Sequence, residues 1–559
     1  MPAAFGGWTA VVEVAYHWRR SRSSPRAGKP STWRRALARL SVPESRLSCK
    51  GGIRLINPGI QWDDRPHWLA RIQELLALRS KEGKGFSRIS GILRLRKLWF
   101  IALEKVLSNK GARTPGVDGK SRRSYQEESE RIQLIDQIMA EIKQRCYKPQ
   151  PVKRMYVPKN PTEKRAIGIP TIKDRVVQEM LRLILEPIYE AKFHNHSYGF
   201  RPFRSTHHAV IRVQSLISLH GYNWVIEGDI RKCFDRIDHD KLMSLLRQDI
   251  KDKRILKLIR MMLKSGVMEE LELFRTELGT PPGGILSPLL ANIYLHELDK
   301  FISRRYEDLD KYSRKKAPVK MFICRYADDW CILINGAQEQ AESVKEEVTV
   351  FLRETLKLEL SEEKTLITPV EKGFDFLGFN VRKYRDGVVH IKPSRKAVQR
   401  LRDKVREITE NLYATGIELG IIQLNHALRG FAEYYRRVYS KRIFRKLDFF
   451  VWWHVLRRIK RFVYGSSRYS TAKFLKQHYY SYDQDVFRMN RHHKGINFGT
   501  RSEEKQRAWM VQALRFYPIQ YSLPHPQFNP YITTDRNKLE ESRVLIRLLS
   551  NTAKYPLKS

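Results

Sequence analysis

Three things are scarce in this sequence: cysteines, acidic residues and long apolar runs. The 559 residues contain five cysteines and no Cys-x-x-Cys pair, which argues against a disulfide scaffold or a cysteine-rich zinc site and favours a reducing compartment. No stretch reaches the roughly 18 apolar residues of a membrane span, so we expect no membrane partner. Acidic residues number 60 against 105 lysines and arginines, a formal net charge of +45. That surplus favours a polyanion, and above all a nucleic acid, as partner.

The N-terminal part differs in composition from the rest. Residues 1–54 contain 11 lysines and arginines but only two acidic residues, Glu13 and Glu44. We expect residues 1–65 to be disordered. The composition suits an organellar transit peptide, a basic RNA-binding arm or a start codon placed too early, and does not choose among them. The predicted location is a bacterial cytoplasm, with association to the nucleoid, or alternatively a mitochondrial or plastid matrix.

The remaining pattern predicts several domains, because 559 residues exceed the size of a single core. Helical spacing runs from about residue 66 to 109. Two strands joined by a loop follow, and Lys159, Lys164 and Arg165 place three cations at or near its tip, where they could grip a phosphate chain or simply face water. A mixed strand and helix pattern extends to about residue 390. Between residues 391 and 470, 19 basic residues against 6 acidic ones, with interleaved aromatics, predict basic helices.

Two adjacent carboxylates, Asp328 and Asp329, interrupt the apolar run ICRYADDWCILI. Aspartates in turns are usually structural. Here both flanks read as buried strands, and like charges at such a tip raise each other's pKa unless a cation offsets them. Asp229, at the end of another apolar strand, adds a third oxygen donor. Three hard oxygen ligands suit Mg²⁺, and two such ions support in-line phosphoryl transfer.

The sequence resembles one family, the reverse transcriptase/maturase proteins encoded by group II introns. The resemblance covers roughly residues 95–465 and rests on an ordered series of motifs: TPGVDG, YVPKNPTEKRAIGIPTIKDRVVQ, SYGFRP, IEGDIRKCFDRIDHD, GTPPGGILSPLLANIYLHELD, RYADD, LSEEKT and FDFLGF. It implies an α+β right-hand polymerase fold with an antiparallel palm sheet, followed by an α-helical thumb, or domain X. The implied boundaries are 66–220 for the N-terminal extension and fingers, 221–390 for the palm, 391–500 for the thumb and 501–559 for a C-terminal extension.

The resemblance also implies roles for individual residues. Asp229, Asp328 and Asp329 would hold two Mg²⁺ ions, with Ile230 as a further metal ligand. Phe234 would close off the sugar 2′ side and favour deoxynucleotides. Lys364 would protonate the departing pyrophosphate. The residues expected to contact the nucleotide are Lys159, Arg165, Phe234 and Arg201. In FLGF (Phe376–Phe379), Gly378 would let the primer backbone approach closely, and LNHALRGFAEYY (Leu424–Tyr435) resembles the signature of domain X.

The sequence departs from the family at two positions and lacks one family domain. Pro282 stands where the family usually has Gln, which could lower polymerase activity or change its fidelity. Phe203 stands where Gly is usual, which questions the local turn geometry. No cysteine follows Cys331, and RHHKGIN at 491–497 is a lone histidine pair, so we expect no C-terminal DNA endonuclease.

The predicted function is RNA-directed DNA polymerisation combined with binding of a group II intron RNA to assist splicing and mobility. Its implied partners are that RNA, an RNA template with a DNA primer, deoxynucleoside triphosphates and a DNA target site. Two alternatives stay open: an RNA-binding maturase with weak or lost polymerase activity, and a reverse transcriptase from a diversity-generating or defence system.

Overall fold

The computed structural model describes residues 65–158, 164–269, 272–274, 279, 283–463, 480–482, 496–498, 513 and 528–537. The chain divides into two compact units, Met1–Trp68 and Leu69–Ser559. The elements described below lie in the second unit, except that the first helix begins at His67, in the first unit. Residues 1–54, Lys159, Pro282 and the histidine pair at 492–493 lie outside the described residues. No described helix has the length and apolar character to cross a bilayer.

The first part of the second unit is helical around a small sheet. Its helices are α2 (His67–Lys81), α3 (Arg96–Ser108), α4 (Glu128–Gln144) and α5 (Ile172–Glu190), with short 3-10 turns η3 (Ile89–Arg94), η4 (Lys110–Arg113) and η5 (Arg122–Tyr125). Helix α5 is buried along almost its whole length. The strands are β1 (Val152–Pro158), β2 (Lys164–Ile169), β4 (Val267–Glu269) and β5 (Glu272–Phe274), in the order β2-β1-β4-β5. Strands β1 and β2 form the expected hairpin.

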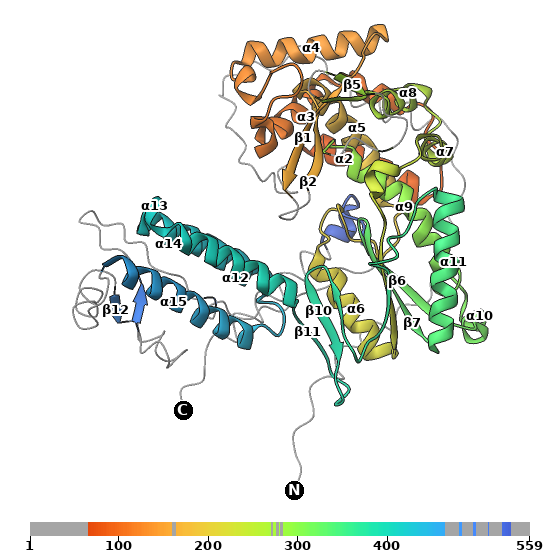
Figure 1. Cartoon of the computed structure of the whole chain (residues 1–559). Helices are drawn as coiled ribbons and strands as arrows, with labels where there is room; N and C mark the ends of the chain where they lie inside the picture. The colour runs from red at the N-terminus through yellow and green to blue at the C-terminus, as the bar shows by residue number, and fades with distance from the viewer. Residues whose placement is uncertain are drawn as a thin grey trace. The chain divides into compact units, whose positions relative to one another are not determined.

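A second, antiparallel sheet has the order β6-β7-β3-β8, from β6 (Lys320–Tyr326), β7 (Asp329–Asn335), β3 (Trp224–Asp229) and β8 (Leu366–Pro369). Alternate side chains of its strands face opposite ways. Cys331 and Leu333 join a core with α6 (Thr206–His220). Helices α9 (Ser287–Ser303) and α11 (Gln338–Leu356) also contact the sheet; Figure 1 shows α11 and α6 on either side of it. The remaining helices of this part are α7 (His239–Asp249), α8 (Lys253–Leu263) and α10 (Lys311–Lys316), with the 3-10 turn η6 (Cys233–Arg236).

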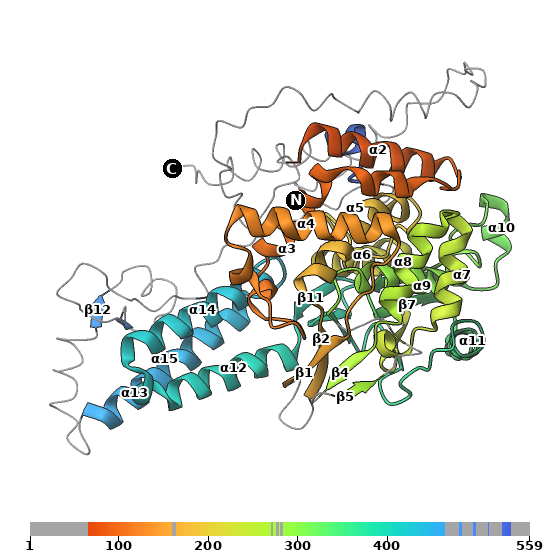
Figure 2. The same ribbon diagram turned by 90° about the horizontal axis from the view of Figure 1, so that it is seen from above.

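A third sheet, β11-β10-β9, leads into a helical bundle. Its strands are β9 (Phe374–Phe376), β10 (Phe379–Lys383) and β11 (Val389–Pro393). The bundle contains α12 (Arg395–Glu410), α13 (Leu412–Thr415), α14 (Ile417–Tyr435) and α15 (Lys441–Val463). Ser394 caps α12 by accepting a hydrogen bond from the Ala397 amide. Leucine and valine side chains of α12, α14 and α15 share one core, and the three helices run beside one another in Figures 1 and 2. Strands β12 (Tyr480–Tyr482) and β13 (Ile496–Phe498) pair beyond it.

The predicted class, helices with mainly antiparallel sheets, is confirmed; the exception to the antiparallel pairing is β1 with β4 in the first sheet. Helices in the described part of the basic segment after residue 391 are confirmed too. The boundaries of fingers, palm and thumb stay predictions.

Candidate metal and nucleotide site

The two aspartates of YADD lie at the tip of a buried hairpin. Strands β6 and β7 are buried over five consecutive residues each, as the apolar flanks predict. Tyr326 pairs with Asp329, so Ala327 and Asp328 alone form the turn. Ala327 has a φ of 59°, a left-handed value that L-residues adopt at some cost, as tight hairpin turns require. Asp328 is therefore held next to the first residue of β7.

A buried arginine holds this turn from behind. Arg325 is 0% exposed and donates two hydrogen bonds to the Asp299 carboxylate of α9, at 2.8 and 2.6 Å. It also donates to Asn292 Oδ1 at 3.0 Å and to the Ala327 carbonyl at 2.9 Å. Burial alone would raise the pKa of Asp299, but the Arg325 guanidinium outweighs burial and holds that pKa well below its usual range. The ion pair thus ties the turn to α9.

The SYGF segment closes against the same turn. The Tyr198 amide donates to the Arg325 carbonyl at 2.8 Å, and Asn292 donates to the Gly199 carbonyl at 2.8 Å. A Cβ on Gly199 would lie 2.2 Å from the Ala327 nitrogen, so only glycine fits there. Sequence reasoning missed Arg325, Asp299 and Gly199 as supporting residues. A charged residue inside the apolar run ICRY is the signal that would have predicted a buried ion pair.

Asp229 reaches the same sheet edge from β3. It is the direct register partner of Asp329, so the last residue of β3 faces the first residue of β7. The preceding Gly228 leaves room for the Trp330 ring, because a Cβ there would lie 2.0 Å from it. The Asp229 carbonyl accepts a hydrogen bond from the Ser361 amide at 2.9 Å. The structure therefore brings together the three carboxylates that the sequence singled out.

Lys364 joins this cluster. Its Nζ donates to Asp229 Oδ2 at 2.8 Å, while its side chain stays 59% exposed. Ile230 forms an isolated bridge with Leu360 and is 3% exposed. Its side chain is a hydrocarbon, so only its main-chain oxygen could serve as a ligand.

Burial and its two neighbouring carboxylates perturb the pKa of Asp329. The pKa of Asp329 rises to about 6 through desolvation first, and then through the charges of Asp328 and Asp229, while Lys364 opposes the rise. The Asp329 side chain nevertheless remains accessible to solvent. A bound cation could therefore reach it and cancel the part of the shift that comes from its neighbours.

The donor set fits a hard divalent cation. Within the described residues, no group of three His, Cys, Asp or Glu side chains is already arranged as a metal site. The site offers only oxygen ligands in an accessible position, and its own cation, the Lys364 ammonium, is bonded to one of them. Carboxylate oxygens with room for water or phosphate ligands are what Mg²⁺ favours. Metal binding by Asp229, Asp328, Asp329 and Ile230 stays a prediction.

The residues predicted to contact the nucleotide lie in different settings. Phe234, in η6, is half-buried, and its ring meets the ring of Phe200 edge-on with centroids 6.4 Å apart. Arg165 pairs through its backbone with Val157 in the β1–β2 hairpin. Lys159 lies outside the described residues. Nucleotide binding by these residues stays a prediction.

The Arg201 guanidinium is buried and hydrogen-bonded within the fold. Arg201 is 6% exposed, and its guanidinium donates to both Glu190 oxygens and to the carbonyls of His194 and Ser197, at 2.6–3.1 Å. All three of its guanidinium nitrogens therefore already have acceptors. A direct contact with a nucleotide stays untested, and a positioning role accounts for every contact that the structure shows.

The FLGF motif contacts the Leu424–Tyr435 motif on α14. Leu377 and Gly378 of FLGF have φ values of 52° and 82°. The Leu377 carbonyl accepts from the Tyr434 hydroxyl at 3.2 Å and the Gly378 carbonyl from the Tyr435 hydroxyl at 3.0 Å. A Cβ on Gly378 would also lie 3.0 Å from the Tyr435 hydroxyl, so the close approach seen here is to α14.

Phe203, the residue found where the family usually has Gly, has a φ of 60°. The turn thus keeps a conformation that glycine adopts readily, and the Phe203 ring packs edge-on against Phe528.

Comparison with known proteins identifies two family regions. Residues 157–381 match the reverse transcriptase (RNA-dependent DNA polymerase) family, and residues 398–479 match the group II intron maturase-specific domain. The chain is 37% identical over 399 residues to the group II intron-encoded protein LtrA of Lactococcus lactis subsp. cremoris, covering 60% of this chain and 65% of LtrA. It is 37% identical over 327 residues to protein YkfC of Escherichia coli K12, covering 53% of this chain and 84% of YkfC.

A solved structure of telomerase from Candida albicans, in complex with a fragment of telomeric RNA, matches with a TM-score of 0.34 and 14% identity. The match covers 59% of this chain and 64% of that one. The sequence matches, rather than this structural one, carry the assignment: the chain belongs to the reverse transcriptase/maturase family encoded by group II introns.

Proposed function

We propose that this protein is an RNA-directed DNA polymerase that also binds a group II intron RNA and assists its splicing and mobility. One observation carries the polymerase proposal. Asp229 and Asp329 are direct partners at the edge of a buried sheet, with Asp328 in the adjoining turn and a pKa of Asp329 raised to about 6. Such a repulsive cluster is stable at neutral pH when cations neutralise it.

Asp229, Asp328, Asp329 and the Ile230 carbonyl would hold two Mg²⁺ ions. When bound, these ions would activate a primer hydroxyl and stabilise the leaving oxygen during nucleotide addition. The chain's own part is positioning. The Arg325–Asp299 pair fixes the turn through the Ala327 carbonyl, and the β3–β7 register sets Asp229 opposite Asp329.

Residues around the carboxylates would handle the nucleotide. Lys364 would neutralise Asp229 and give a proton to departing pyrophosphate. This role is supported by the 2.8 Å between its Nζ and Asp229 Oδ2 and by its exposed side chain. Phe234 would exclude a 2′ hydroxyl, supported by its contact with Phe200. Lys159 and Arg165 would contact the triphosphate of an incoming deoxynucleotide. Arg201 would position the SYGF segment through Glu190.

Primer extension tests the proposal directly. Asp229→Asn, Asp328→Asn and Asp329→Asn should each abolish Mg²⁺-dependent extension of a DNA primer on an RNA template. Asp240→Asn is the matched control, because the Asp240 side chain is 80% exposed and its ion pair in the described part of the chain is with an exposed arginine. Extension retained by the triad variants would refute the site.

The maturase role is separable. The maturase-specific match at residues 398–479 lies outside the carboxylate cluster, so the triad variants should still promote splicing of the cognate intron RNA. If the wild-type protein assists splicing but extends no primer, that result would support the second candidate, an RNA-binding maturase with lost polymerase activity. DNA target recognition and a bacterial or organellar location stay predictions.

A further inference from the structure

Helix α15 presents a stripe of cations and rings on its outer side. Lys446, Phe449, Trp453 and Arg457 recur at intervals of three or four residues, so they share one face of the helix. Phe449 is 40% and Trp453 42% exposed, and both cations are exposed. The opposite face carries Leu447, Val451 and Val455, which are buried in the bundle core. Core packing therefore does not account for these two rings.

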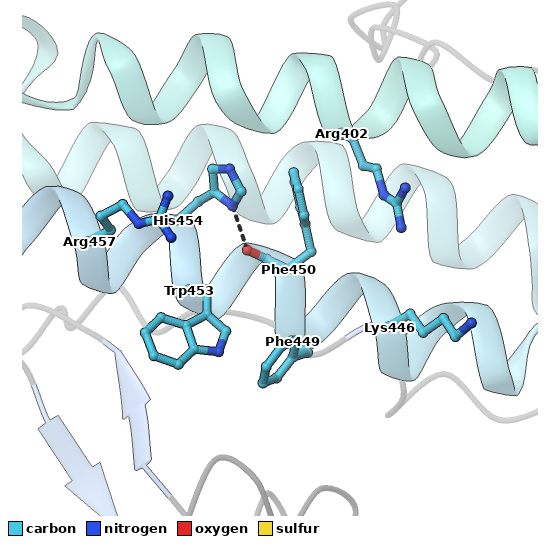
Figure 3. A pocket seen from close by; sticks show the side chains of 7 residues that line it. All are labelled: Arg402, Lys446, Phe449, Phe450, Trp453, His454 and Arg457. Atoms are coloured by element: carbon cyan, nitrogen blue, oxygen red, sulfur yellow. Dashed lines mark hydrogen bonds between the residues drawn. The ribbon is translucent and has the colours of Figure 1, made fainter.

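The stripe borders a hollow of about 520 Å³. Its lining also includes Phe450 and His454 of α15 and Arg402 of α12. Figure 3 shows the Phe449 and Trp453 rings next to each other, between Lys446 and Arg457 along the helix. Their ring centroids lie 6.1 Å apart in an edge-on arrangement.

The inner wall of the hollow contains a buried donor without an acceptor among the described residues. The Phe450 carbonyl lies 2.9 Å from His454 Nδ1. The Arg402 guanidinium lies over the Phe450 ring, 5.4 Å from its centroid. Arg402 Nε is buried and has no hydrogen-bond partner within the described part of the chain. A buried donor without an acceptor is unfavourable, so Arg402 keeps hydrogen-bonding capacity that a ligand meeting its guanidinium could use.

The residues that line the hollow favour one class of ligand. Its seven residues include three permanent cations and no carboxylate, which suits a phosphate. Two exposed ring faces suit a base, and stacking on aromatic side chains is how unpaired bases are commonly bound. A base inside a duplex is already stacked and cannot use these faces. A second copy of the chain is disfavoured, because it carries the same +45 charge.

We propose that this hollow is a binding site for an unpaired RNA nucleotide, with its base stacked on Trp453 beside the Phe449 ring and its phosphate held by Lys446, Arg457 and Arg402. The proposal rests on the proposed RNA-binding function and deepens it, by naming the structural class of RNA that the α12–α15 face takes. The site lies within the region that matches the maturase-specific domain.

The test uses the full-length protein and a labelled, unstructured single-stranded RNA of roughly 10 nucleotides, within the usual site size of single-strand binders. Fluorescence anisotropy gives the dissociation constant. Trp453→Ala should weaken binding about 5- to 150-fold, the range for loss of one stacked base. Trp453→Phe should restore most of it. Tyr312→Ala is the matched control, because Tyr312 is an exposed ring, 67% accessible, on α10.

Three further arms define the ligand. Binding of a blunt RNA duplex should change less than twofold in Trp453→Ala. A DNA strand of the same sequence separates RNA from DNA, and a loss confined to DNA would overturn the assignment to RNA. Arg457→Gln should lower the salt dependence of binding to single-stranded RNA by about 0.7 log units per log unit of salt.

Unchanged affinity in Trp453→Ala, or an equal loss on duplex and single strand, would overturn the proposal. So would an altered oligomeric state together with unchanged RNA binding, because that result would assign the face to a second copy. Primer extension by the same preparations keeps the two proposals apart. A wild type that extends no primer would refute the polymerase, while a Trp453-dependent loss on single-stranded RNA would still support the pocket.

Discussion

The buried Arg325–Asp299 pair provides the sharpest prediction for the scaffold of the site. Arg325→Met removes the guanidinium but keeps much of the apolar volume. Asp299 is then left 0% exposed without its cation, and the Ala327 carbonyl loses a hydrogen bond of 2.9 Å. Breaking one side of a buried ion pair costs about 3–5 kcal/mol, because the remaining charge stays desolvated. At about 1.4 kcal/mol per factor of ten, local opening of the sheet should become about 140- to 3,700-fold more frequent.

Hydrogen exchange of the β6 and β7 amides measures this opening. The double variant Arg325→Met with Asp299→Leu should recover most of the lost protection, because it removes both buried charges. A single variant with wild-type exchange in β6 and β7 would refute the reasoning. So would a double variant as unprotected as the single one.

The sign of the pH dependence is a second check on the same pair. In the wild type, the pKa of Asp299 is lowered, so its contribution to stability is present above its ordinary pKa of about 3.9 and is lost as pH falls below it. In Arg325→Met, burial without a cation raises the pKa of Asp299, and folding then takes up a proton. The stability deficit of the variant should therefore shrink from pH 8 to pH 5.

Three other predictions concern the carboxylates, the β3 glycine and the sugar gate. The pKa of Asp329 is raised to about 6, so the folded state binds an extra proton between roughly pH 4 and 6 and gains stability as pH falls through that window. Asp329→Asn removes the charge and should therefore raise the melting temperature at pH 8 more than at pH 5. Equal shifts of the melting temperature at the two pH values would contradict the charge argument. Gly228→Ala places a Cβ 2.0 Å from the Trp330 ring and should destabilise the protein by about 1–3 kcal/mol. In a double-mutant cycle followed by thermal melts, Trp330→Leu should relieve part of that cost. Phe234→Ala should lower the preference for deoxy- over ribonucleotides about 10- to 100-fold in kcat/KM of primer extension, with a smaller loss for Phe200→Ala, and unchanged preference would remove Phe234 as the gate.

Local patterns predicted much of the fold because they report local physics. The apolar runs around YADD predicted two buried strands, since a strand that is covered on both faces must be apolar along its length. The basic segment after residue 391 predicted helices, because apolar residues at helical spacing imply a buried face. The same segment could not show which rings are buried: Phe444 and Trp452 lie in cores, whereas Phe449 and Trp453 remain exposed.

The sequence alone determined the chemistry of the candidate site: oxygen ligands, a positive surplus for a polyanion, and the order of motifs that places the chain in its family. Only the tertiary structure decided which residues support that chemistry. Asp229 and Asp329 are a hundred residues apart, and their pairing depends on β3 and β7 meeting in register. Arg325 points at Asp299 only once α9 packs on β6. Contacts between distant segments depend on how whole elements pack, and no local pattern of residues records that packing.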